Sequence, residues 1–109
     1  MKLYLTNTTI LPNDGTYQMN TVDLLVAKEV LNNIQFTEVV SAIGHQSTAE
    51  IISELIEREV KMNRVMIEME VSDVMLAFKL KQRPPEGIIL TKDQIEELGY
   101  EFKIIERLC

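Results

Sequence analysis

Cysteine and histidine are nearly absent from this chain of 109 residues, which contains one of each. Cys109 is the last residue, so the sequence excludes an intrachain disulfide. One cysteine and one histidine cannot supply the ligands of a zinc site, and we expect no metal ion at the functional site. The shortage of cysteine favours a protein of the reducing cytoplasm.

Long apolar runs and basic runs are also missing. A membrane-spanning helix needs about 20 consecutive apolar residues, and no segment approaches that length. The chain turns polar at Thr6 and Asn7, too early for a signal peptide. Its formal net charge is −6, and affinity for duplex nucleic acid depends on a basic face. We therefore expect neither a membrane nor a nucleic acid duplex as partner, while a small anionic ligand stays open.

Short apolar runs and amphipathic segments alternate along the chain, as in a single α/β domain over residues 1–109. The expected strands cover residues 3–5, 17–19, 36–43, 64–70, 76–81 and 102–105, with 64–70 and 76–81 forming a hairpin. The expected helices cover residues 22–31, 46–58 and 91–98. The pattern predicts a mixed sheet of about five strands flanked by about three helices.

Local signals set the ends of these helices. Asn20 or Thr21 is expected to cap the first helix. Thr91 and Gln94 have the spacing of a capping box for the third helix, and Gly99 is expected to end it.

The segment 42–48 carries the clearest functional signal, because a strand ends there, Gly44 turns the chain and a helix begins. Unpaired N–H groups at a helix N-terminus favour a bound phosphate, and glycine permits close approach of the ligand. Ser47 and Thr48 add hydroxyl donors. The only histidine, His45, lies in this segment and is suited to proton transfer near neutral pH. The alternative is that His45 is a capping or surface residue.

A second polar cluster covers residues 79–87, where cations and a carboxylate follow a strand in a proline-stiffened loop. Arg83 is suited to bidentate phosphate binding, and Glu86 to orienting a histidine or a ribose hydroxyl. Arg64 and Asn7 also lie at strand ends, where they are either structural or ligand contacts. Solvated charge at a strand end is the alternative for the whole cluster.

Other enzyme classes lack their motifs. The sequence contains no glycine-rich phosphate loop of the kinase or NTPase kind and no Gly-x-Ser-x-Gly element. Its acidic residues have the spacing of solvent-facing helix positions, so no pair of carboxylates suggests a glycosidase.

Four segments, taken together and in order, resemble a known family. They are 3–7 (LYLTN), 42–48 (AIGHQST), 63–65 (NRV) and 82–87 (QRPPEG) followed by Leu90 and Thr91. With these segments the sequence resembles the viral anti-CRISPR ring nucleases, a family also found on bacterial mobile elements. The resemblance extends over nearly the full length. The sequence departs from the family pattern at Gln46, where some relatives have an acidic residue, and at Pro84-Pro85.

The resemblance implies a metal-independent phosphodiesterase that needs no cofactor and acts as a homodimer in a bacterial or archaeal host cell. Such an enzyme binds cyclic tetra-adenylate and cleaves it to linear adenylates with 2′,3′-cyclic phosphate ends, which counteracts type III CRISPR signalling. His45 and Glu86 are then the catalytic residues. The predicted ligand-binding residues are Asn7, Gly44, Ser47, Thr48, Arg64, Gln82 and Arg83.

Two other functions stay open on the sequence. The same fold could bind a cyclic oligoadenylate without cleaving it, as a sponge or sensor, and the departures at Gln46 and Pro84-Pro85 keep that hypothesis. A small acidic protein could also serve a mobile element as a protein-interaction factor that uses its acidic helices.

Overall fold

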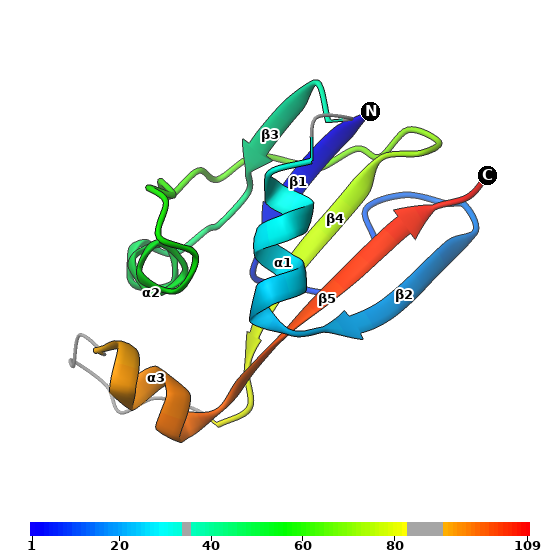
Figure 1. The fold of residues 1–109 in the computed structure, drawn as a ribbon. Helices are drawn as coiled ribbons and strands as arrows, with labels where there is room; N and C mark the ends of the chain where they lie inside the picture. The colour runs from blue at the N-terminus through cyan, green and yellow to red at the C-terminus, as the bar shows by residue number, and fades with distance from the viewer. Residues whose placement is uncertain (34–35, 83–90) are drawn as a thin grey trace.

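The computed structural model describes residues 1–33, 36–82 and 91–109, and in these residues five strands form one mixed sheet with three helices (Figure 1). The elements are β1 (Lys2–Thr6), β2 (Tyr17–Val22), α1 (Leu24–Leu31), β3 (Glu38–Ser41), α2 (Gln46–Ile56), β4 (Val74–Leu80), α3 (Lys92–Leu98) and β5 (Tyr100–Arg107). The predicted α/β class, with its mixed sheet and helices, is confirmed.

The strand order is β2-β5-β4-β1-β3. The central strand β1 is parallel to both β3 and β4, and its Leu5 pairs with Ser41 on one side and Leu76 on the other. β5 runs antiparallel to β4 and β2. Because carboxyl ends of parallel strands meet at one edge, the chain leaves β1, β3 and β4 at the same edge of the sheet.

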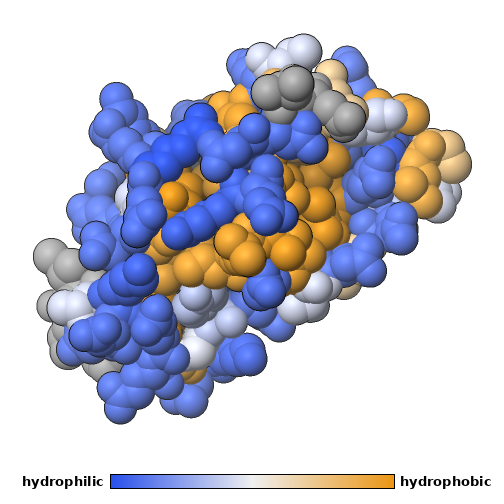
Figure 2. Space-filling view, in the orientation of Figure 1, coloured by the Kyte–Doolittle hydropathy of each residue, from blue (hydrophilic) through white to orange (hydrophobic). Residues whose placement is uncertain are grey.

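All three helices contribute to the core on one face of the sheet. Alternate residues of β1 point to this face, where Leu3 and Leu5 are buried. The inward stripe predicted for α2 is confirmed, since Ala49, Ile52 and Leu55 are fully buried. The sheet residues in this core include Val74, Leu76, Phe78 and Phe102. Figure 2 shows apolar residues across the middle of the face that carries α1, framed by hydrophilic ones.

The other face of the sheet carries a smaller cluster of Tyr4, Met69, Met75 and Ile105. Met69 belongs to the irregular chain between α2 and β4, which crosses this face. The predicted hairpin of residues 64–70 with 76–81 is therefore wrong. Both edges of β4 are occupied by β1 and β5, so residues 64–70 pack against the sheet instead of joining it.

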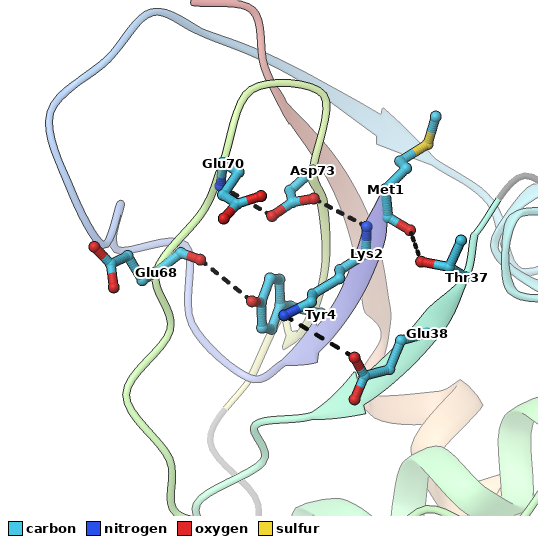
Figure 3. A network of polar contacts seen from close by, with 8 residues as sticks. All are labelled: Met1, Lys2, Tyr4, Thr37, Glu38, Glu68, Glu70 and Asp73. Carbon is cyan, nitrogen blue, oxygen red and sulfur yellow. Dashed lines mark hydrogen bonds and ion pairs between the residues drawn. The ribbon is translucent and has the colours of Figure 1, made fainter.

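Polar contacts fix the end of this crossing segment at the amino end of β1 (Figure 3). Asp73 is almost fully buried, and its carboxylate accepts hydrogen bonds from the backbone N–H of Lys2 and Glu70, both at 2.9 Å. The Tyr4 hydroxyl donates to the carbonyl of Glu68 at 3.2 Å. These bonds tie residues 68–73 to the sheet.

Two capping predictions have different outcomes. Asp23, and not Asn20 or Thr21, caps α1, because β2 continues through Val22 and its residues are already in the sheet. The capping box of Thr91 and Gln94 on α3 is present as predicted. Among the described residues, no helix has both the length and the apolar character required to cross a membrane.

Candidate functional site

The predicted site residues gather at the edge where the parallel strands end. Asn7 follows β1, Gly44 and His45 follow β3 by a short loop, and Gln82 follows β4. The backbone N–H of Ala42 donates to the Leu5 carbonyl at 2.7 Å, which keeps the chain after β3 beside β1. Ligands of open α/β sheets bind outside the carboxyl ends of the strands, so this edge is the expected place for a ligand.

His45 is the N-cap residue of α2, and it is exposed to solvent. Its backbone is extended, with φ −132° and ψ 132°, and its carbonyl accepts the first helical bond from Ala49 at 3.1 Å. The imidazole makes no capping hydrogen bond to the helix. The ring therefore does not act as the capping side chain, and it is available to a ligand at the N-terminus of α2, called the helix mouth below.

The mouth of α2 also carries free backbone donors. No described residue accepts a hydrogen bond from the N–H of Gln46, Ser47 or Thr48. The first turn contains no acidic residue, and the Gln46 side chain bonds to Glu50 one turn further on, at 3.2 Å. Unpaired N–H groups and the positive end of the helix dipole attract an anion. No described carboxylate occupies this position in place of a bound anion.

Arg64 lies beside this mouth although it is 20 residues away from Gly44 in the chain. Its Nε donates to the Gly44 carbonyl at 2.9 Å. Asn63 fixes the neighbouring backbone beside β3. Its N–H donates to the Ile43 carbonyl at 2.8 Å, and its side-chain amide donates to the Ser41 carbonyl at 2.7 Å. The sequence did not assign this positioning role to Asn63, because the contact depends on where the segment after α2 returns to β3.

Of the remaining predicted residues, four lie in the described part of the chain and two lie outside it. Asn7 is half-buried in a turn closed by the bond from the Thr8 N–H to the Thr6 hydroxyl, at 3.2 Å. Gln82 and Ser47 are exposed and Thr48 is half-buried. The predictions for Arg83 and Glu86 lie outside the described residues.

A shallow depression runs along the outer side of α2 and reaches Gln46 in its first turn. Its lining includes four carboxylates and two cations, namely Glu50, Glu54, Glu57, Glu59, Arg58 and Lys61. An excess of carboxylates repels a phosphate, so the depression does not fit the anionic ligand that the helix mouth fits. In residues 1–33, 36–82 and 91–109 no group of three acidic, histidine or cysteine side chains is placed to hold a metal ion.

Comparison with known proteins agrees with this fold. The model of the STIV B116-like family matches residues 3–102. This chain belongs to the STIV B116-like family. The solved structure of B116 of Sulfolobus turreted icosahedral virus superposes on it with a TM-score of 0.84 at 23% identity, covering 98% of this chain and 100% of that one.

Relatives in this family occur in archaeal viruses and in a bacterium. Uncharacterized protein 26 of Sulfolobus islandicus filamentous virus is 34% identical over 95% of this chain and 90% of its own length. Uncharacterized protein ORF117 of Acidianus two-tailed virus is 35% identical over 97% and 93%. Uncharacterized protein YddF of Bacillus subtilis is 27% identical over 99% of both chains. These names state no activity.

Proposed function

We propose that this protein is a metal-independent ring nuclease that binds cyclic tetra-adenylate and cleaves a phosphodiester bond of the ring. One observation carries the proposal: the imidazole of His45 stands, without a capping hydrogen bond, at a helix mouth whose first N–H groups are unpaired among the described residues. Phosphodiester cleavage needs a proton donor next to groups that stabilise an anion, and this mouth offers both.

The ribose of the substrate supplies the nucleophile. Its 2′ oxygen attacks the adjacent phosphorus while the bond from phosphorus to the 5′ oxygen breaks. The 2′ hydroxyl gives its proton to solvent or to a base, and His45 gives a proton to the departing 5′ oxygen. The products are a linear adenylate with a 2′,3′-cyclic phosphate at one end and a 5′ hydroxyl at the other. Holding the 2′ oxygen in line with the leaving oxygen supplies much of the rate.

The N-terminus of α2 and Arg64 stabilise the negative charge of the reacting phosphate in this proposal. The N–H groups of Gln46, Ser47 and Thr48 point out of the first helical turn toward a bound phosphate. Arg64 brings a permanent positive charge next to Gly44. Arg83 and Glu86 complete the site in this proposal, on the resemblance to the ring nucleases alone.

The proposed activity would counteract type III CRISPR signalling by destroying its messenger. The occurrence of relatives in archaeal viruses supports such a role, because a virus gains from silencing the defence of its host.

The test is an incubation of the purified protein with cyclic tetra-adenylate in the presence of EDTA, followed by liquid chromatography, which separates ring from linear product, and by tandem mass spectrometry. We expect linear adenylates that are isomeric with the ring substrate and end in a 2′,3′-cyclic phosphate. Tight binding without product would instead support the non-catalytic sponge or sensor. The absence of binding would contradict both and leave the protein-interaction factor.

A further inference from the structure

One stretch of chain after α2 contacts both α2 and the loop in front of it. Residues 60–64, called the brace below, leave the end of α2 and run beside the end of β3. At the start of the brace, the backbone N–H of Val60 donates to the Ser53 hydroxyl of α2 at 2.8 Å. At its end, Arg64 donates to the Gly44 carbonyl at 2.9 Å. The brace therefore joins the helix to the loop that precedes it.

The middle of the brace covers the outer edge of β3, which is the last strand of the sheet. The N–H of Ala42 donates to the Leu5 carbonyl of β1, so the carbonyls of residues 41 and 43 point to the opposite side. Asn63 occupies both of these carbonyls, one with its backbone N–H and one with its side-chain amide. It takes the place that a neighbouring strand would have.

Ser41 adds a contact in the other direction, because its hydroxyl donates to the Lys61 carbonyl at 2.6 Å. With the two bonds of Asn63 and the bond of Arg64, four hydrogen bonds join residues 41–44 to residues 61–64. None of these four bonds involves the imidazole of the next residue, His45. The brace fixes the backbone that carries this ring and leaves the ring itself to a ligand.

We propose that Asn63 is a positioning residue for ring cleavage, which acts through the loop to hold the His45 imidazole where proton transfer requires it. This inference rests on the proposed function. Alignment is demanding, since a displacement of about 1 Å can lower a reaction rate ~10²-fold. Phosphate binding depends instead on the N–H groups at the helix mouth, which stay in place because buried apolar side chains hold α2 on the core. The cleavage step should therefore depend on Asn63 far more than the affinity does.

Single-turnover cleavage of cyclic tetra-adenylate by Asn63→Ala tests this separation. With the enzyme at saturating concentration, we expect the cleavage rate to fall ~10–10²-fold. The dissociation constant for the ring should stay close to the wild-type value. A wild-type cleavage rate, or an affinity that falls in the same proportion as the rate, overturns the proposal.

Asn32→Ala is the matched control, because Asn32 makes the same kind of bond far from the loop. Its side-chain amide donates to the Lys28 carbonyl at 2.9 Å at the end of α1, and both asparagines are exposed. This variant should bind and cleave the ring like wild type. A loss of rate as large as that of Asn63→Ala would indicate a general effect of stability and contradict the positioning role.

Ser41→Ala tests the brace from its other partner and carries the test if Asn63→Ala does not fold. It removes the bond to the Lys61 carbonyl, and it should slow cleavage without weakening binding. Because both residues act through the same segment, the double variant should lose less than the product of the two single losses. Losses that multiply would show that the two residues act independently, and would overturn the brace as one unit.

Amide hydrogen exchange in the unliganded protein separates this inference from the proposed function. Asn63→Ala should speed exchange at Ala42, whose N–H bonds to Leu5 where the loop begins, and leave exchange at Leu55 in α2 unchanged. If wild type leaves the ring intact, the proposed function fails, while faster exchange at Ala42 still shows that Asn63 holds the loop. Unchanged exchange at Ala42 overturns the inference even when the wild-type protein cleaves the ring.

Discussion

Gly44 precedes His45 in the loop between β3 and α2, and its backbone does not use the conformational freedom of glycine. The positive-φ glycines of the described residues are Gly15 and Gly99. A Cβ added at Gly44 would meet only Arg64 Cγ, at 3.9 Å, which is an ordinary contact. The fold of the described residues therefore shows no need for glycine here, whereas a ligand approaching the backbone does need it.

The variant Gly44→Ala tests whether the glycine is required by the fold or by the ligand. We expect the free energy of unfolding to stay equal or to rise by about 0.4–1 kcal/mol, because alanine restricts the unfolded chain. Affinity for cyclic tetra-adenylate should fall, because the methyl group lies where the phosphate approaches. Chemical denaturation and ligand titration measure the two effects.

Gly99→Ala is the contrasting control. Gly99 has φ 83°, and a Cβ there would meet the Lys81 side chain at 3.2 Å. This variant should lose about 1 kcal/mol of stability. Unchanged ligand affinity in Gly44→Ala would show that the glycine does not serve the ligand.

Tyr4 gives a prediction on pH. Burial raises the pKa of its phenol, Lys2 partly opposes this, and the carboxylates of Asp73, Glu38 and Glu70 add to it. The folded state thus holds the phenolic proton more tightly than the unfolded state. This contribution to stability is complete below the unfolded pKa, near 10, and is lost as the pH rises through the folded pKa.

Tyr4→Phe removes this titration together with the bond to the Glu68 carbonyl. We expect the variant to be less stable than wild type at about pH 8 and the difference to shrink above pH ~10. Urea unfolding at both pH values measures it, and a difference that stays constant across this range would contradict the assignment. Tyr100 also has a pKa raised by burial, but it titrates in both proteins and cancels in the difference.

At the scale of elements, α2 holds the site in place. Its first residue follows His45, and Leu55 near its other end is fully buried in the core against the sheet. The predicted and observed helices agree in their start at Gln46 because the signals are local: a strand, a glycine and an apolar stripe with helical spacing.

Leu55→Ala should lower the free energy of unfolding by about 2–5 kcal/mol, since it leaves a cavity between α2 and the sheet. The helix mouth should then lose rigidity, and ligand affinity should fall even though Leu55 lies outside the site. Glu54→Ala, at the neighbouring exposed position, should change stability by less than about 0.5 kcal/mol. Equal effects of the two variants in thermal unfolding would contradict this account of α2.

Residues 64–70 show where the sequence misleads. Their alternation predicted that Val65, Ile67 and Met69 point to one side. Ile67 and Met69 do pack behind the sheet, but Val65 is exposed. Alternation reports which way side chains face, but not which strand is the neighbour, and both edges of β4 were already taken. The contact of Arg64 with Gly44 has the same origin, since it depends on a return of the chain over 20 residues.

At the scale of the molecule, an acidic chain has the groups that we propose to bind an anion at one edge of its sheet. The net charge is −6, and carboxylates line the outer side of α2, but the first turn of α2 carries none. The parallel arrangement of β1, β3 and β4 creates this edge. The sequence placed residues 42–48 and 79–87 at strand ends, but it did not show that these strands lie beside β1, because strand order depends on long-range pairing.

The central claim is that His45 donates the proton to the leaving oxygen, and a single-turnover comparison of wild type with His45→Ala tests it most directly. With cyclic tetra-adenylate, EDTA and enzyme in excess, we predict that the variant binds the ring nearly as tightly as wild type. Its cleavage rate should fall ~10²–10⁴-fold, the usual contribution of a general acid. A variant that cleaves the ring at the wild-type rate would contradict the account.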